Sequence, residues 1–352
     1  MDRRNFIKAC GLTSASLLIN DNVFAEETTQ WKRTPHIKPV VCSCFEFHHP
    51  SIPEGKYWND SLTNFTEAQW KAKVKEIAEI GIQYLVLNNV ANFGKTYYPS
   101  KIQPRHDEYV CSDPLEAVLA AADECGVKFF VSNGFWGNWA QTRNLMIDKE
   151  VAKIRFAAME EMAEKYGHHK SFYGWYYPNE SGLHNGIDDI TMNYCNQCNH
   201  VAKELMPHSV NMLSPYGTMS VRLDDNYVRQ LEKLDIDIVS YQDEVGVKKT
   251  KAGYAGKYFE GLYQAHAKAG RSRLWADVEF FEFEGPVYRS ALLPADFSRI
   301  LKQMEDVSPY AEHIMIYDYI GMMNKPGSLA FAGHPSSVKL YTDYVNWLKA
   351  QQ

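Results

Sequence analysis

The feature that most constrains the fold of this 352-residue chain is an eightfold alternation of short apolar stretches with longer amphipathic ones. The apolar stretches predict β-strands at 39–47, 82–90, 127–135, 172–180, 209–217, 236–246, 272–284 and 313–323. The amphipathic stretches predict helices at 66–81, 112–126, 148–166, 188–206, 224–234, 254–270, 294–304 and 335–351. Strands that alternate with helices of this length favour a parallel sheet with crossover helices. Eight such units fit a closed barrel, so we predict an α/β protein whose residues 38–350 form a single-domain (β/α)8 TIM barrel.

An open, doubly wound sheet is the main alternative to a barrel. That fold usually carries a glycine-rich phosphate-binding turn after its first strand. Here the first strand runs into EFHHPSIPEG at 46–55, which is no such turn. The sequence therefore favours the barrel and predicts no nucleotide cofactor.

The first 25 residues have the three-part order of an export signal. Arg3 and Arg4 precede a modest apolar run at 9–19, and a small-residue cleavage site follows at Ala25. This order is typical of twin-arginine signals. We expect residues 1–25 to be removed and the mature protein to be periplasmic or extracellular.

Charge and hydropathy exclude two classes of partner. The net charge of −6 is spread along the chain without a basic patch, which makes nucleic acid an unlikely partner. No later segment has the roughly 18 consecutive apolar residues of a membrane span. We expect neither partner for the mature protein.

The cysteines leave several alternatives open. Cys195 and Cys198 form a Cys-x-x-Cys with His200 close by, but a structural zinc site usually needs a second pair of ligands. Metal binding, a disulfide and ordinary free thiols all remain possible for this pair. Cys42 and Cys44 are two residues apart on a predicted strand and should share one face of it.

Polar and aromatic side chains gather at the predicted ends of the strands, where barrels of this type carry their chemistry. Almost no Lys or Arg lies among them, which disfavours phosphoester substrates. Aromatic rings among them suit stacking on sugar faces. The candidates for substrate binding are Glu46, His48, Asn89, Asn133, Trp136, Tyr177, Asn179, Tyr241, Asp243, Trp275, Asp277 and Tyr317.

Two glutamates stand out as candidate catalytic residues. Glu180 ends the fourth predicted strand and Glu279 lies late in the seventh, so their ends should face each other across the barrel mouth. Two such carboxyls can divide the work of glycoside cleavage, one as proton donor and one as nucleophile. Glu282 is an alternative to Glu279, and a helix-terminal role is the alternative for Glu180.

These motifs resemble those of the clan A retaining glycoside hydrolases, which have an Asn-Glu pair ending strand four and a Glu ending strand seven. The resemblance implies Glu180 as acid/base, Asn179 as a contact to the sugar 2-hydroxyl and Glu279 as nucleophile. The segments GWYYPNE and LWADVEFFEFE also resemble a group of secreted bacterial glycosyl-hydrolase-like barrels of poorly defined activity.

The sequence thus predicts a secreted glycoside hydrolase that acts on an oligo- or polysaccharide without a cofactor or metal. Two alternatives stay open. The first is a metal-dependent sugar isomerase or epimerase, in which Glu180, Asp243 and Glu279 would contribute to an oxygen-rich site. The second is a carbohydrate-binding barrel without catalytic activity.

Overall fold

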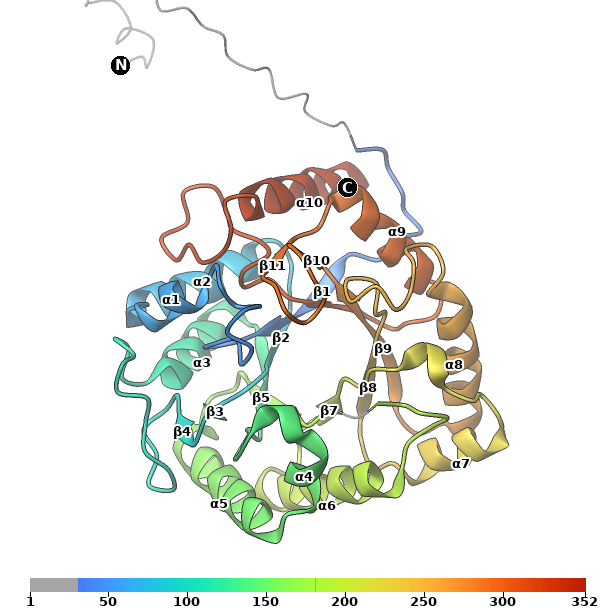
Figure 1. Cartoon of the computed structure of the whole chain (residues 1–352). Helices are drawn as coiled ribbons and strands as arrows, with labels where there is room; N and C mark the ends of the chain where they lie inside the picture. The colour runs from blue at the N-terminus through green and yellow to red at the C-terminus, as the bar shows by residue number, and fades with distance from the viewer. Residues whose placement is uncertain (1–30, 181) are drawn as a thin grey trace, which may run out of the picture. The chain divides into compact units, whose positions relative to one another are not determined.

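The computed structural model describes residues 31–180 and 182–352, so the predicted export signal at 1–25 lies outside the described residues. Eight parallel strands close into a barrel in the order β1, β2, β5, β6, β7, β8, β9, β12 (Figure 1). They are β1 (Val40–Phe45), β2 (Tyr84–Leu87), β5 (Lys128–Ser132), β6 (Phe172–Tyr176), β7 (Met212–Leu213), β8 (Ile238–Gln242), β9 (Arg273–Glu279) and β12 (Ile314–Tyr317). The predicted single-domain (β/α)8 barrel is confirmed.

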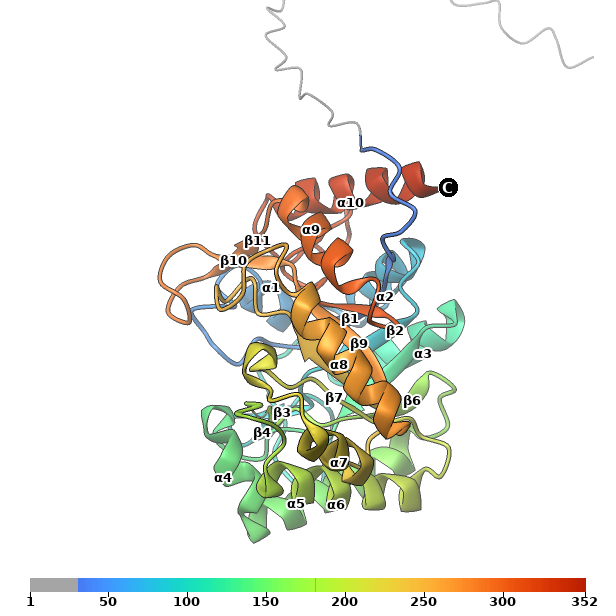
Figure 2. The same ribbon diagram turned by 90° about the vertical axis from the view of Figure 1, so that its right-hand side faces the viewer.

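Helices surround the barrel and cover the outer face of its strands (Figures 1 and 2). They are α1 (Asn59–Thr63), α2 (Glu67–Glu79), α3 (Pro114–Cys125), α4 (Thr142–Ile147), α5 (Lys149–Tyr166), α6 (Asp189–Leu205), α7 (Asp225–Lys233), α8 (Gly256–Ala269), α9 (Phe297–Val307) and α10 (Ser337–Gln351). Two short hairpins lie outside the barrel sheet, β3 (Ala91–Asn92) with β4 (Lys95–Thr96) and β10 (Phe281–Phe283) with β11 (Leu292–Pro294).

Local sequence signals explain where the helices begin and end. Thr66 and Gln69 form a complete capping box at the start of α2. Asp113, rather than the neighbouring Ser112, caps α3 and accepts a hydrogen bond from the backbone N–H of Glu116. Gly126 ends α3 with φ of 72°, a left-handed conformation that glycine adopts without strain.

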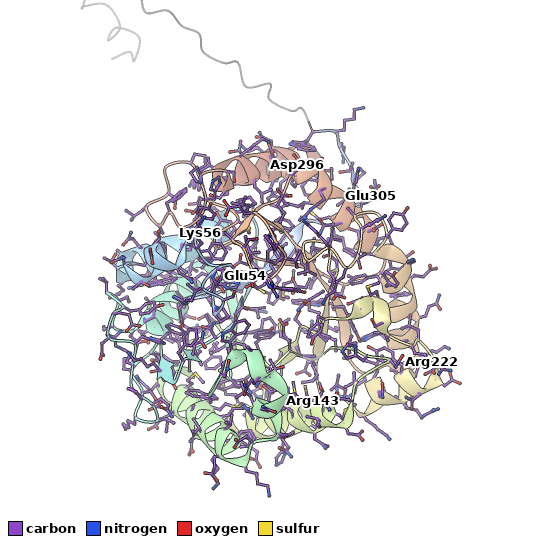
Figure 3. All side chains as sticks on the ribbon, in the orientation of Figure 1. Glu54, Lys56, Arg143, Arg222, Asp296 and Glu305 are labelled. Atoms are coloured by element: carbon purple, nitrogen blue, oxygen red, sulfur yellow. The ribbon has the colours of Figure 1, made fainter. Side chains whose placement is uncertain are left out.

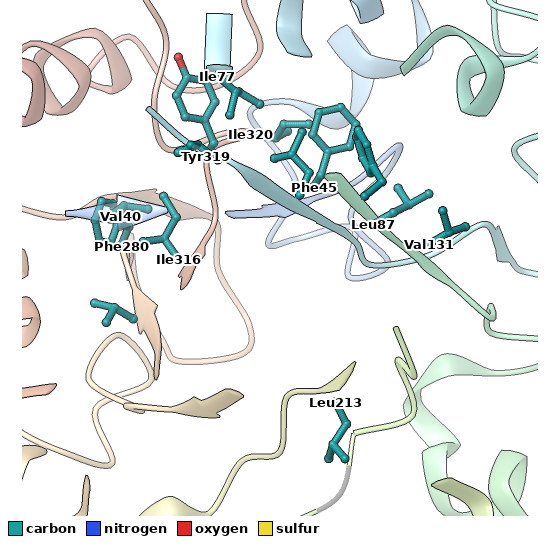
Figure 4. Packing of buried hydrophobic residues seen from close by; sticks show 14 of the residues in the cluster. Val40, Phe45, Ile77, Leu87, Val131, Leu213, Phe280, Ile316, Tyr319 and Ile320 are labelled. Carbon is teal, nitrogen blue, oxygen red and sulfur yellow. The ribbon is translucent and has the colours of Figure 1, made fainter. Parts of the chain in front are cut away.

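Strand side chains alternate between two apolar regions. Outward-facing side chains such as Phe45, Leu87, Ile316 and Phe280 pack in the core between the strands and the helices (Figure 4). Inward-facing side chains form a smaller cluster inside the barrel, which includes Cys42, Cys44, Val86, Phe130, Tyr176, Met212, Ile238, Trp275 and Met315. Cys42 and Cys44 therefore share the inner face, as the sequence predicts.

The predicted strand at 272–284 is in fact two elements. β9 ends at Glu279, and β10 then pairs antiparallel with β11 outside the barrel sheet. Phe280 marks the division, because its N–H still bonds to Tyr317 of the barrel while its carbonyl accepts from Ala295. The predicted strand at 209–217 is also shorter and keeps only Met212–Leu213 as β7. Apolar composition alone does not show where a strand leaves the barrel.

A glycine permits the close approach of β6 to the start of β7. A Cβ atom on Gly174 would lie 1.5 Å from the carbonyl oxygen of Val210, a distance that no side chain can occupy. Any larger residue at 174 would push these segments apart just below the site described next.

The cysteines of the described residues are free thiols, and Cys195 and Cys198 are both buried. His200 instead lies beside Glu204 on the exposed face of α6, with 3.3 Å between Nε2 and Oε1. Within residues 31–180 and 182–352, no helix has the length and apolar character needed to span a bilayer.

Candidate active site

A cavity of about 680 Å³ opens at the carboxyl ends of the barrel strands, a size typical of small-molecule sites. Its walls come from the strand ends and from the segments after β1, β5, β8 and β9. Glu54 lies over the middle of the barrel in Figure 3, whereas Arg222 and Glu305 lie at its periphery. Five predicted site residues line the cavity: Asn89, Glu180, Asp277, Glu279 and Tyr317.

Strand β9 places three predicted residues at increasing height on the inner face of the barrel. Trp275, Asp277 and Glu279 alternate with outward-facing residues. Asp277 and Glu279 reach the cavity, but Trp275 is fully buried among Tyr84, Phe130 and His313. The prediction that Trp275 contacts substrate is therefore wrong, because its ring closes the opposite end of the barrel.

Glu279 is held firmly at the end of β9. Its side chain is buried, and Oε2 accepts a hydrogen bond from the N–H of Val247 at 2.9 Å. A Cβ on Gly246 would lie 2.9 Å from the same oxygen, so glycine allows the loop after β8 to pass directly over the carboxyl. The Arg299 guanidinium donates to the Glu279 carbonyl at 2.7 Å and fixes the backbone.

Glu180 reaches the cavity from the segment that follows β6. Its Oε1 accepts a hydrogen bond from Nε2 of Gln242 at 3.1 Å. Gln242 lies in register with Asp277 on the neighbouring strand, and both side chains line the cavity. Gln242 is a functional candidate that is missing from the predicted set. The alternation of residues along β8 is the signal that could have found it, because Gln242 faces inward and its neighbours face outward.

Burial raises the pKa of both candidate catalytic carboxyls. Desolvation raises the pKa of Glu180 to about 7, opposed by the hydrogen bond from Gln242 and the positive charge of Lys249. Desolvation, followed by the negative charge of Asp243, raises the pKa of Glu279 well above its ordinary value. The raised pKa values favour the protonated form of these carboxyls, which can donate a proton, over a wider pH range than for exposed glutamates.

Asp277 is a third carboxyl of the cavity. Its Oδ2 accepts a hydrogen bond from the Ser214 hydroxyl at 2.9 Å, and its Oδ1 has no protein partner. Burial raises its pKa to about 8, with further contributions from Asp243 and Glu180. The unpartnered Oδ1 leaves one hydrogen-bonding position of this buried carboxyl unused by the protein.

Lys249 contributes the positive charge of the cavity wall. Its Nζ lies 3.0 Å from Oε1 of Glu244 and 4.9 Å from the centre of the Tyr216 ring. Glu244 is itself fixed by the N–H groups of Gly217 and Thr218, both at 2.9 Å. The lysine is thus held at the mouth of the cavity by a buried anion and an aromatic face.

Three predicted residues near β5 and β6 lie on the outer side of the strands. Asn179 donates to the hydroxyl of Tyr194 at 3.0 Å, and Asn133 donates to the sulfur of Cys198 at 3.3 Å. Tyr177 packs against the same Tyr194 ring. None of the three lines the cavity, so the implied contact of Asn179 with a sugar 2-hydroxyl has no support in the geometry. The inward-facing neighbour of Tyr177 is Tyr176, which does line the cavity.

Two predicted residues of β8 and its loop also face outward. The Tyr241 hydroxyl lies 2.5 Å from that of Tyr227 and 2.9 Å from Nε2 of His266. Asp243 accepts hydrogen bonds from Gln303 at 2.7 Å and from the backbone N–H of Glu279 at 3.3 Å. Tyr241 is a packing residue. Asp243 positions Glu279 from the outer side of the barrel, through the backbone N–H of Glu279.

The remaining predicted residues surround the cavity without lining it. Glu46 is buried and accepts from the indole N–H of Trp58 at 2.7 Å. The His48 carbonyl accepts from Asn89, which itself lines the cavity, whereas the lining histidine is His49. The indole N–H of Trp136 donates to the Asn133 carbonyl.

The two glutamates of the seventh unit differ in their position relative to the cavity. Glu282 is exposed on the β10–β11 hairpin and does not line the cavity. Glu279, at the end of β9, does. This hairpin also supplies the lining residues Phe281, Tyr288 and Leu292. They are absent from the predicted set because the sequence pattern does not show that the chain leaves the barrel after Glu279 and folds back over its mouth.

A second depression of the described chain, of about 670 Å³ between Pro99, Arg105 and Lys165, lies away from the strand ends, where barrels of this type carry their chemistry. Within the described residues, the carboxylates of the cavity form no group of three that converges as metal ligands do. The donor set of the cavity therefore gives no support to the alternative of a metal-dependent isomerase.

Comparison with known proteins places the chain in a family. It belongs to the family described as "Domain of unknown function (DUF4434)", whose model matches residues 47–330. No curated protein matches the chain in sequence.

Solved structures of glycosidase type share the fold. A "putative alpha-L-fucosidase" from Bacteroides thetaiotaomicron VPI-5482 matches at 17% identity and TM-score 0.69, over 98% of this chain and 99% of the other. A beta-galactosidase from the psychrophilic Marinomonas ef1 matches at 14% identity and TM-score 0.57, over 89% of this chain and 59% of the other. The endo-1,4-beta-mannanase from Rhizomucor miehei matches at 9% identity and TM-score 0.52, over 80% and 91%. At these identities the likeness establishes a glycosidase-like fold.

Proposed function

We propose that this protein is a glycoside hydrolase that cleaves an oligo- or polysaccharide with the carboxyls of Glu180 and Glu279. The observation that carries the proposal is that the two side chains line one cavity from the ends of different barrel strands. The elevated pKa of Glu180, about 7, suits a residue that must hold a proton at neutral pH. The glycosidase-like fold and the aromatic rings of the cavity support a sugar as ligand.

In the proposed retaining reaction, Glu180 donates its proton to the glycosidic oxygen as the bond to the anomeric carbon breaks. Glu279 attacks that carbon and forms a glycosyl ester, which water then hydrolyses while Glu180 takes back a proton. Gln242 orients the Glu180 carboxyl, and the Val247 N–H orients that of Glu279. Asp277 offers its unpartnered oxygen to a sugar hydroxyl.

The protonation states restrict the pH at which this reaction runs. Turnover requires Glu279 to be ionised and Glu180 to be protonated at the same time. The pKa values of both are raised, so this form is most populated at a higher pH than the 4 to 5 expected of exposed carboxyls. The proposal therefore includes a pH optimum above that range.

The test is hydrolysis of a panel of aryl glycosides and polysaccharides by the wild type and by Glu180→Gln and Glu279→Gln. We expect both variants to lose the activity that the wild type shows, while Glu282→Gln, on the exposed hairpin, retains it. Full activity in either catalytic variant would remove that residue from the mechanism. Binding of a polysaccharide without hydrolysis by the wild type would instead favour a carbohydrate-binding barrel.

A chemical rescue experiment assigns the two roles. Azide should restore turnover to Glu279→Ala by attacking the anomeric carbon directly, which gives a glycosyl azide of inverted configuration. In Glu180→Ala, azide should act after the glycosyl ester has formed and give the retained configuration. Proton NMR of the two products distinguishes the anomers, and exchanged outcomes would exchange the roles.

We also propose that residues 1–25 direct export, on the basis of the Arg3-Arg4 pair and the apolar run that follows. The double variant Arg3→Lys, Arg4→Lys should accumulate inside the cell with its first 25 residues attached. Immunoblotting of cell fractions measures this, and export of the double variant equal to that of the wild type would contradict the twin-arginine assignment.

A further inference from the structure

A second cluster of ligand-type side chains lies outside the barrel, where the loop that enters β6 packs against α3. His169 bridges two carboxylates of that helix, with Nδ1 2.7 Å from Oδ2 of Asp123 and Nε2 3.1 Å from Oε2 of Glu116. His168 lies beside it, with the two ring centres 4.1 Å apart. One ligand atom from each of Glu116, His168 and His169 lies within 4.8 Å of the other two.

Part of this cluster is rigid. Asp123 is fixed by its second oxygen, which accepts the backbone N–H of Ser171 at 2.7 Å. Ser171 in turn donates its hydroxyl to the Leu119 carbonyl at 2.8 Å. His169 is buried, and its Nδ1 contact with Asp123 directs Nε2 towards Glu116. A carboxylate on one ring nitrogen, with the other nitrogen directed at a further ligand-type side chain, is the arrangement found around metal-ligating histidines.

The other part of the cluster is accessible and adjustable. His168 is exposed, and about half of the Glu116 side chain is open to solvent. Zinc ligands at about 2.0–2.2 Å from the ion lie roughly 3.4 Å from one another in a tetrahedron. Small movements of the two exposed side chains towards the fixed His169 would reach that spacing.

We propose that Glu116, His168 and His169 form a binding site for a divalent transition metal, with Zn²⁺ as the best match. Two imidazole nitrogens and one carboxylate oxygen suit Zn²⁺ and disfavour Mg²⁺ and Ca²⁺, which prefer oxygen ligands. A water molecule completes the tetrahedron. The ion joins α3 to the loop before β6, and its binding is independent of the glycosidase proposal because it lies away from the cavity.

The simpler reading of the same contacts is an ion pair in which His169 alone joins the two carboxylates. That reading gives His168 no function and predicts no dependence on metal. His168 is therefore the residue that distinguishes the two interpretations.

The experiment uses the full chain treated with EDTA and then freed of the chelator. Titration calorimetry and thermal unfolding are measured with ZnCl₂, and with MgCl₂ as the ion that the site should reject. The variants are His168→Ala and the matched control His200→Ala, which removes an exposed histidine that also lies beside a glutamate. Both substitutions are on the surface, so both variants should fold.

We expect Zn²⁺ to bind with a stoichiometry of one and to raise the Tm of the wild type and of His200→Ala, with no effect of Mg²⁺. His168→Ala should bind Zn²⁺ at least about tenfold more weakly, the size of loss expected when a metal site is disturbed. No rise in the Tm of the wild type with Zn²⁺, or equal binding by His168→Ala and His200→Ala, would overturn the proposal.

Discussion

Trp275 and Glu279 lie on the same strand and point to the same side of it, yet they occupy different environments. They are four positions apart in the sequence, which is about 13 Å along a strand. Trp275 is buried in an aromatic cluster with Tyr84 and His313, whereas Glu279 borders a cavity of about 680 Å³. Depth along the strand, rather than the side of the sheet alone, separates a core residue from a candidate catalytic one.

The largest effect on activity should come from a substitution at the end of β9 that borders the cavity. Glu279→Gln keeps the shape of the side chain but removes the oxygen that we propose as nucleophile, so we expect kcat/KM to fall by about 10³-fold or more. Thermal unfolding should change little, because a buried carboxyl with a raised pKa gains little from ionisation. Steady-state kinetics and a melting curve on one preparation measure both. A large loss of Tm with unchanged kcat/KM would show that Glu279 serves stability rather than activity.

At the end of β9 away from the cavity, a substitution should lower the stability of the protein. Trp275→Ala removes a fully buried ring from the barrel interior, and we expect a loss of about 3–5 kcal/mol in the free energy of unfolding. The control is Trp139→Ala, because Trp139 lines the cavity and is only partly buried. Urea denaturation should show a small loss for this control, and kinetics should show a raised KM. Equal destabilisation by the two variants would contradict the conclusion that Trp275 belongs to the core and Trp139 to the cavity wall.

A buried acid outside the cavity should affect the pH dependence of stability. Burial raises the pKa of Glu46 to about 8, so the folded state keeps a proton that the unfolded state releases above about pH 4.5. The free energy of unfolding should therefore fall as the pH rises from about 4.5 to about 8. Glu46→Gln cannot ionise and should show a shallower fall in urea denaturation across this range. An unchanged slope would show that Glu46 ionises normally.

The smallest effect should come from the partner of Glu180. The hydrogen bond from Gln242 favours the ionised form of Glu180 and so lowers its pKa relative to burial alone. In the wild type, kcat/KM should decline as the pH rises through about 7, where Glu180 loses its proton. Gln242→Leu should move this decline to higher pH by about one unit or less. A shift to lower pH would contradict the account.

The sequence predicts the barrel well because eight repeated units are a strong signal that no single residue can obscure. It also predicts that Glu180 and Glu279 lie near each other, and both line the cavity, Glu279 from the end of β9 and Glu180 from the segment after β6. The sequence is a weaker guide to which of two neighbouring residues faces the cavity. It predicts Tyr177, Asn179 and Tyr241 as site residues, whereas the structure places their side chains on the outer side, next to the cavity-lining Tyr176, Glu180 and Gln242.

The wrong prediction for Trp275 has a different cause. The depth of this residue in the barrel follows from the strand register, which is set by pairing with distant segments and not by local composition. The convergence of His168 and His169 with Glu116 likewise depends on how α3 packs against a loop more than 40 residues later in the chain. No periodicity in the sequence encodes such a contact.

The most direct test of the central claim is to trap the glycosyl ester. Aryl 2-deoxy-2-fluoro glycosides slow its hydrolysis, so the protein incubated with a panel of them should gain the mass of one sugar. Peptide mass spectrometry should place that sugar on Glu279, the carboxyl at the top of β9. A sugar on Glu282 or on another residue, or rapid hydrolysis of these reagents by an enzyme in which Glu279 is replaced by Gln, would contradict the account.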